Sequence, residues 1–172
     1  MRKLLSAEQI DEGVGRLADE ILLVYAGKPL TILGVLNGSI VLLADLIRRL
    51  DISLQVGLVQ ASSYRVSGSE PGPLKIDLTM LPEIGGRHVL LVDDIFDTGN
   101  TLSALVEQLR QVGPESVRTA VLLRKHGRKA VSMEPDHVGF EIPNQFVVGY
   151  GLDYRDAFRN LPYVAIMEDG DA

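Results

Sequence analysis

Cysteine is absent from this chain of 172 residues. Its absence excludes disulfide bonds, a thiolate nucleophile and any metal site built on cysteine sulfur. The chain therefore needs no oxidising compartment in order to fold. Any chemistry that it performs must depend on carboxylate, hydroxyl, amide or cationic groups.

Long hydrophobic runs are also missing. The basic N-terminal residues are followed by only two consecutive leucines, too few for the apolar part of a signal peptide. The most apolar stretch, residues 30–47, is interrupted by the polar residues 37–39 and contains Asp45, whose carboxylate would be costly in lipid. We therefore expect a cytoplasmic protein with no membrane partner.

Positive charge is in deficit, because 17 Lys and Arg stand against 23 Asp and Glu, and the formal net charge is -6 at pH 7. Extended binding to nucleic acid draws most of its affinity from the neutralisation of phosphates, so this balance disfavours a nucleic-acid partner. The overall field also repels phosphorylated substrates. Such a substrate would have to be held by locally placed donors and a metal ion.

The order of apolar segments predicts the fold class. A hydrophobic content of 46% suits a single domain over residues 1–172. A first helix is expected after Ser6, which together with Gln9 has the spacing of a capping box. Strand, helix and strand then follow at 30–36, 40–50 and 52–61, and again at 88–93, 99–112 and 117–123. Two such units predict an α/β fold, with a parallel-sheet core and helices on both faces.

Two segments lie outside this pattern. Residues 62–73 collect Ser, Gly, Pro and Arg with little periodicity, which predicts a mobile loop. After Leu123 the helical pattern disappears, and short strands are expected near 138–142, 146–148 and 163–167. We expect these strands to form a small hood beside the sheet, over residues 137–167.

The densest chemical pattern lies in residues 89–101, a buried strand that ends in Asp93 and Asp94 and then bends into a helix. Ligands of open parallel sheets bind beyond the carboxyl ends of the strands. The two carboxylates can accept hydrogen bonds from a ribose diol or bind a hydrated magnesium ion, which prefers hard oxygen ligands. A phosphate monoester can bind the free amides and hydroxyls at the helix start, contributed by Thr98, Gly99, Asn100 and Thr101.

This segment resembles the phosphoribosyl pyrophosphate motif of the type I phosphoribosyltransferases, and the wider chain is similar to the hypoxanthine-guanine members of that family. The family's pyrophosphate loop corresponds here to Leu36, Asn37 and Gly38, and its flexible lid to Ser63 and Tyr64. Its purine-contacting lysine segment corresponds to Leu122–Lys125, and its base-binding hood to Phe140–Tyr154 with Phe158 and Arg159. The resemblance implies the type I phosphoribosyltransferase fold, with a small hood formed by C-terminal and N-terminal segments.

The resemblance also implies an activity. Such an enzyme of purine salvage, a glycosyltransferase acting by pentosyl transfer, moves the 5-phosphoribosyl group of phosphoribosyl pyrophosphate to hypoxanthine or guanine. The products are IMP or GMP and pyrophosphate. The implied partners are phosphoribosyl pyrophosphate, a 6-oxopurine base and further copies of the chain in a homodimer or homotetramer. The apolar helix 40–50 is a candidate for the symmetric interface.

For the base, the resemblance implies one role for each matched residue. Asp97 would be the general base that removes the proton from purine N7 while N9 attacks the anomeric carbon. Lys125 would donate a hydrogen bond to O6, which selects a keto purine over adenine. Phe146 would stack on the base, and Val147 would present backbone groups to its edge.

For the phosphates, the implied cofactor is Mg²⁺. Asp153 would bind the ion on the pyrophosphate, with Asp93 and Asp94 as further candidate ligands. Arg159 would add positive charge as the leaving group departs. The ribose gains oxocarbenium character in such transfers, so the lid residues Ser63 and Tyr64 would exclude water.

The sequence departs from the family pattern at two positions. Asn37 stands where related enzymes often carry Lys or Arg, so contact with pyrophosphate there would rest on backbone amides. The Leu36–Asn37 bond is also a candidate for the non-proline cis peptide of the family's loop. Asp93 replaces the more frequent Glu, which keeps the charge but shortens the side chain by one methylene.

Taken singly, these residues also have structural interpretations. An acidic pair at a strand end can cap a loop, Lys125 and Arg159 can be solvated surface charges, and Phe146 can belong to the core. Tyr150 and Tyr154 are interpreted as packing residues. The three histidines lack the spacing of metal ligands and receive no role.

Two other classes of protein share parts of the pattern. A regulatory RNA-binding protein with a phosphoribosyltransferase fold would need a basic face, against which the net acidity argues. A receiver-like signalling domain also pairs carboxylates at a strand end and binds magnesium. It would need a phosphate-accepting Asp after a later strand, but the strand 117–123 is followed by Arg124 and Lys125.

Overall fold

The computed structural model of the protein describes residues 1–63, 74–168 and 170. Its main sheet is built, within these residues, from β2 (Leu30–Leu36), β3 (Leu54–Ser63), β4 (Leu74–Asp77), β5 (His88–Phe96), β6 (Ser116–Lys125) and β7 (His137–Ile142). The spatial order is β4-β3-β2-β5-β6-β7. All neighbours pair in parallel except β4, which runs antiparallel to β3 at one edge.

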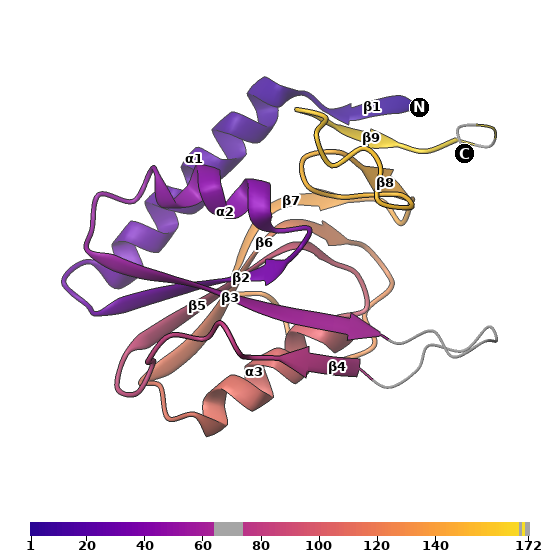
Figure 1. Cartoon of the computed structure of the whole chain (residues 1–172). Helices are drawn as coiled ribbons and strands as arrows, with labels where there is room; N and C mark the ends of the chain where they lie inside the picture. Colours follow the sequence, from indigo (N-terminus) through magenta and orange to yellow (C-terminus); the bar gives the residue numbers. More distant parts are fainter. Residues whose placement is uncertain (64–73, 169, 171–172) are drawn as a thin grey trace.

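Helices cover both faces of this sheet (Figure 1), as the sequence predicted. α1 (Ala7–Tyr25) and α2 (Ile40–Ile47) lie on one face and α3 (Asn100–Gln111) on the other. Alternate residues of β5 serve the two layers: Leu90 and Val92 join the core of α1 and α2, whereas Val89 and Leu91 join that of α3. Because the central strands are buried from both sides, their sequences are continuous runs of apolar residues.

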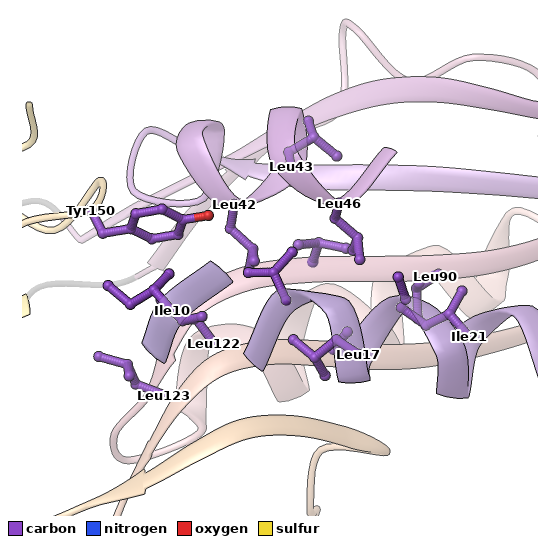
Figure 2. Packing of buried hydrophobic residues seen from close by; sticks show 14 of the residues in the cluster. Ile10, Leu17, Ile21, Leu42, Leu43, Leu46, Leu90, Leu122, Leu123 and Tyr150 are labelled. Atoms are coloured by element: carbon purple, nitrogen blue, oxygen red, sulfur yellow. The ribbon is translucent and has the colours of Figure 1, made fainter. Parts of the chain in front are cut away.

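The apolar stripe of α1 fixes this helix on the sheet. Buried side chains recur on one face with helical spacing, and they pack against α2 and the strands in one cluster (Figure 2) that includes Ile10, Leu17, Ile21, Leu42, Leu46 and Leu122. The predicted capping box is present, since Ser6 Oγ accepts the amide of Gln9 and the Gln9 side chain accepts the amide of Ser6.

A second, smaller sheet joins the two ends of the chain. It contains β1 (Arg2–Leu5), β8 (Val147–Val148) and β9 (Val164–Ile166) in the order β1-β9-β8, with antiparallel pairing. Figure 1 shows it beside the carboxyl ends of the main strands, near both termini. The hood of C-terminal and N-terminal segments is therefore present.

Several predicted boundaries need correction. The strand expected near 138–142 is not part of the hood, because β7 pairs with β6 and forms an edge of the main sheet. β3 continues to Ser63 through pairing with β4, and the remainder of the predicted loop, 64–73, lies outside the described residues. The helix expected over 40–50 ends at Ile47. In the described part of the chain, no helix has the length and apolar character needed to span a membrane.

Candidate active site

The topology places an opening between β2 and β5. The chain leaves β2 toward β3 on one side and leaves β5 toward β6 on the other, so the strand order reverses at this point. Pairing of β2 with β5 ends at Gly34 and Val92, whereas pairing of β5 with β6 continues to Phe96. The carboxyl ends of β2 and β5 therefore diverge, and ligands of open α/β sheets bind at such a crevice.

A cavity of about 340 Å³ occupies this crevice. Most of the predicted site residues line it, namely Leu36, Asn37, Gly38, Asp93, Asp94, Asp97, Thr98, Gly99, Thr101, Asp153 and Arg159. The sequence expectation that β5 ends at Asp93 was wrong, since the strand runs to Phe96. Asp93 and Asp94 thus lie on the free edge of β5, and Asp97 is the first residue beyond it.

The turn from β5 into α3 has the geometry expected of a phosphate site. Gly99 is the residue before the helix and has a φ of 84°, a left-handed conformation that favours glycine. A Cβ atom there would lie 2.5 Å from Val131 and 2.6 Å from the Phe96 ring, so no larger side chain fits. The first amides of α3 have no acceptor within the helix, and the turn that precedes them lines the cavity. Asn100 is exposed and does not line the cavity.

Asp93 and Asp94 form a buried acidic pair. Burial raises the pKa of Asp93 well above its usual value, and the charge of Asp94 raises it further. Burial also raises the pKa of Asp94, against which hydrogen bonds and the charge of Arg159 act. Asp94 reaches the loop after β2, because a Cβ atom on Gly38 would lie 1.7 Å from its Oδ2 atom. A bound cation would offset the repulsion within this pair.

Asp153 and Arg159 also line the cavity and form an ion pair there. Arg159 Nη2 lies 2.8 Å from Asp153 Oδ1, and its Nη1 donates a hydrogen bond of 2.7 Å to the carbonyl of Gly151. Among the described residues, no group of three histidine or acidic side chains is arranged as a ready-made metal site. Magnesium does not require one, because it commonly binds one or two carboxylates together with substrate phosphates and water. The hard oxygen donors of Asp93, Asp94 and Asp153 fit that ion.

Asp97 lies between two cations at the carboxyl end of β5. Lys125 Nζ donates a hydrogen bond of 3.2 Å to its Oδ2 atom. Arg128 Nε lies 3.0 Å from Oδ1, but the angle is not that of a hydrogen bond. The Oδ1 atom is consequently buried without a hydrogen-bond partner among the described residues. A proton-bearing ring nitrogen that used this acceptor would have to take the place of Arg128 beside it.

Of the residues predicted to contact the base, Asp97 lines the cavity, whereas Lys125, Phe146 and Val147 lie apart from its lining. Val147 is buried in β8, whereas the Phe146 side chain is 51% exposed, with its ring edge-to-face with Tyr154 at 5.7 Å. Ser63 ends β3, and Tyr64 lies outside the described residues. The Leu36–Asn37 peptide bond is cis, as the sequence suggested it could be.

Arg128 is a residue that the sequence reasoning missed. It follows Lys125 by three positions in a run of cationic residues, where the sequence alone does not indicate which side chain turns toward Asp97. Ala61, Phe96 and Leu102 also line the cavity without having been predicted. Their side chains are apolar, so nothing in their chemistry distinguishes them from core residues.

Residues 3–155 of this chain match the family described as the phosphoribosyl transferase domain. The hypoxanthine-guanine phosphoribosyltransferase of Streptococcus pneumoniae is 39% identical over 166 residues, which cover 96% of this chain and 92% of that protein. The enzyme of the same name from Aquifex aeolicus is 41% identical, with coverage of 98% and 96%.

Solved structures of similar proteins have the same architecture. A hypoxanthine phosphoribosyltransferase from Staphylococcus aureus superposes with a TM-score of 0.91 at 36% identity, covering 98% of this chain and 91% of that one. A mutant hypoxanthine phosphoribosyltransferase of Trypanosoma cruzi, in a ternary complex with substrates, gives a TM-score of 0.90 at 34% identity, with coverage of 98% and 96%.

Proposed function

This chain belongs to the phosphoribosyl transferase domain family, and we propose that it is a purine salvage enzyme acting on hypoxanthine or guanine. It transfers the 5-phosphoribosyl group of phosphoribosyl pyrophosphate to the base. A bond forms between purine N9 and the anomeric carbon, and the bond from that carbon to the pyrophosphate oxygen breaks. The products are IMP or GMP and pyrophosphate.

The observation that carries this proposal is the position of Asp97. Its carboxylate lines the cavity next to the turn from β5 into α3, and its Oδ1 atom forms an ion pair with Arg128 but no hydrogen bond among the described residues. The Asp97 carboxylate would take the proton from purine N7 as N9 attacks. A well-placed carboxylate contributes a factor of about 10² to 10⁴ in rate.

The choice of base would rest on Lys125, Phe146 and Val147. Lys125 is 9% exposed and its ammonium already lies beside Asp97, so it can donate a hydrogen bond to O6 of a base whose N7 faces Asp97. Adenine presents an amino group there, which is also a donor. The exposed ring of Phe146 offers a surface for stacking, and β8 brings backbone groups of Val147 alongside.

The phosphate groups would be held at two places. The amides and hydroxyls of Thr98, Gly99 and Thr101, which line the cavity, together with Asn100 would hold the 5-phosphate. The backbone of residues 36–38 would face the pyrophosphate. When bound, magnesium supplies positive charge to the leaving pyrophosphate. Asp153 would hold it, with Asp93 and Asp94 as further oxygen donors, and Arg159 would add its own charge. Ser63 and Tyr64 would belong to the lid that excludes water.

We also propose that the protein works in the cytoplasm as a homodimer or homotetramer. Ile40, at the start of α2, is 50% exposed, which leaves apolar surface at this helix for a second copy. Light scattering of the purified protein would measure the mass directly. A monomer at micromolar concentration would contradict the proposed assembly without affecting the proposed reaction.

The test is a magnesium-dependent conversion assay with phosphoribosyl pyrophosphate and, separately, hypoxanthine, guanine, xanthine, adenine and uracil. We expect nucleotide from the 6-oxopurines, and a rate lower by about 10² to 10⁴ in Asp97→Asn. Asp19→Asn is the matched control, because Asp19 is an exposed carboxylate on α1. Conversion of uracil alone, or of no base, would contradict the proposal and lead to a test of RNA binding.

A further inference from the structure

Tyr150 has a backbone conformation that its side chain does not favour. Its φ is 51°, and it lies between Gly149 and Gly151, whose φ values are 96° and 97°. Non-glycine residues in this left-handed region carry a cost of about 1–2 kcal/mol. A third glycine would avoid that cost, so the tyrosine side chain must contribute something in return.

The contribution of the side chain is a hydrogen bond to another element. The Tyr150 hydroxyl donates to Asp45 Oδ2 on α2 at 2.7 Å, while the residue as a whole is 6% exposed. Figure 2 shows the ring near Ile10, with its hydroxyl directed toward α2. Burial, and then this bond to Asp45, raise the pKa of Tyr150 far above its usual value, so the hydroxyl remains a donor.

The bond joins two segments that lead into loops lining the cavity. α2 begins immediately after the loop of Asn37 and Gly38, and Tyr150 begins the loop that carries Asp153 and Arg159. The two loops also touch directly, since a Cβ atom on Gly151 would lie 2.1 Å from the Gly38 carbonyl oxygen. In the second loop, the Tyr150 amide donates to the Leu161 carbonyl at 2.8 Å.

We propose that Tyr150 and Asp45 form a positioning pair that fixes the distance between the two pyrophosphate-binding loops of this enzyme. The proposal rests on the proposed function, because it takes residues 37–38 and Asp153 with Arg159 as the pyrophosphate side of the site. Neither Tyr150 nor Asp45 touches the reacting atoms. The pair acts by holding the backbone of one loop against the other.

Loss of the bond should therefore affect one substrate more than the other. Tyr150→Phe keeps the ring in the core but removes the hydroxyl. Among the described residues, this hydroxyl is the only donor by which the loop starting at Tyr150 binds Asp45. We expect the KM for phosphoribosyl pyrophosphate to rise roughly tenfold, because that factor corresponds to the free energy of one hydrogen bond to a charged acceptor. The KM for hypoxanthine should change less than about twofold, because Lys125 lies on β6 and forms no hydrogen bond or ion pair with Tyr150 or Asp45.

The partner residue gives a graded test. Asp45→Asn keeps an oxygen that can accept the hydroxyl, whereas Asp45→Ala does not. We expect Asp45→Asn to fall between the wild type and Asp45→Ala, because its acceptor is neutral, and Asp45→Ala to resemble Tyr150→Phe. The double variant Tyr150→Phe/Asp45→Ala should be no worse than either single variant, since both remove the same contact.

Tyr25→Phe is the matched control. Tyr25 is also buried, at 1% exposure, and its hydroxyl has no hydrogen-bond partner among the described residues. We expect both KM values of this variant to equal those of the wild type. Melting temperatures of all variants should be measured alongside, so that loss of folded protein is separated from a change in KM.

Two results would overturn the proposal while the wild type remains active. One is an unchanged KM for phosphoribosyl pyrophosphate in Tyr150→Phe. The other is an equal rise of both KM values, which indicates general loosening of the fold. An inactive wild type would instead contradict the proposed function, so the two failures are distinguishable.

Discussion

Gly38 and Gly151 are the residues at which a single methyl group would disturb the site most. A Cβ atom on Gly38 would overlap the Asp94 carboxylate at 1.7 Å, and one on Gly151 would meet the Gly38 carbonyl oxygen at 2.1 Å. The second contact is with backbone, which cannot rotate away. Gly151 also has a φ of 97°, so an L side chain at this position is strained even without the contact.

We expect Gly151→Ala to lower kcat/KM by roughly 10²-fold, because displacement of reacting groups by about 1 Å has that effect. Gly38→Ala should be milder, since the Asp94 side chain has some freedom to move. Steady-state kinetics with phosphoribosyl pyrophosphate and hypoxanthine would measure both. Gly15→Ala is the control, because a Cβ atom there has no neighbour closer than 3.7 Å. Equal activity of Gly151→Ala and the control would disprove the contact argument.

At the scale of one element, helix α1 contains a pair of glycines in contrasting surroundings. A Cβ atom on Gly13 would lie 2.2 Å from the Phe140 ring on β7, so this glycine permits the close approach of helix and strand. Gly15 is only partly buried and faces the end of the Arg49 side chain. Both have ordinary helical conformations, for which alanine has the higher intrinsic propensity.

We expect the same substitution to have opposite effects at these positions. Gly15→Ala should raise the free energy of unfolding by about 0.5–1 kcal/mol through helix propensity. Gly13→Ala should lower it by about 1–3 kcal/mol, because the added methyl group forces the helix from the sheet. Urea unfolding followed by circular dichroism measures both. Stabilisation by Gly13→Ala would mean that α1 is not seated on β7 as described.

The helices and strands differ in how well the sequence alone predicts them. The capping box at Ser6 and the apolar strands β2 and β5 are local patterns, and these predictions were confirmed. The polar edge strand β4 and the short strand β1 have no such pattern. β4 pairs with the preceding strand β3, and β1 pairs with β9 at the other end of the chain. β7 was predicted as a strand but not as part of the main sheet, because periodicity does not indicate the partner of a strand.

The same distinction applies to the site. The residues of one contiguous segment, Asp93–Thr101, were predicted together because their order along the chain shows a strand end and a helix start. The contact of Arg128 with Asp97 and that of Tyr150 with Asp45 depend on side-chain direction after folding. Tyr150 was predicted as a packing residue, and its ring is indeed buried. The sequence pattern does not predict the hydrogen bond from its hydroxyl to Asp45 on α2.

At the scale of the whole molecule, the stability of the core in alkali depends on a buried phenol. Burial raises the pKa of Tyr25 to about 12. The neutral form is favoured in the fold, so its contribution to stability is fully present below about pH 10, the ordinary value for tyrosine. It is lost as the pH rises from there toward about 12.

Tyr25→Phe cannot ionise and should escape that loss. At about pH 8 we expect it to be no less stable than the wild type, because it removes a buried hydroxyl that lacks a partner among the described residues. Between about pH 10 and 12 its advantage in free energy of unfolding should grow, since only the wild type has Tyr25 to titrate there. Urea midpoints over this range provide the measurement. A constant difference would show that Tyr25 is not protected from ionisation.

The charge of the whole molecule would make the proposed magnesium ion decisive for substrate binding. The net charge is -6, and the charged residues that line the cavity in the described part of the chain are Asp93, Asp94, Asp97 and Asp153 against Arg159. Phosphoribosyl pyrophosphate is itself a polyanion, so without a counterion it meets repulsion both at a distance and inside the cavity. Magnesium removes charge from the substrate and is attracted by the carboxylates, so each ligand should strengthen the binding of the other.

We therefore expect phosphoribosyl pyrophosphate to raise the melting temperature strongly only when magnesium is present. At about 100 times the dissociation constant, a bound ligand adds about 2.7 kcal/mol, which is several degrees for a domain of this size. Each component alone should give a much smaller shift, and Asp153→Asn should lose much of the magnesium-dependent part. An equal shift with phosphoribosyl pyrophosphate in the presence of a chelator would mean that the cationic side chains suffice. The acidic pair of Asp93 and Asp94 would then require another explanation than a bound metal.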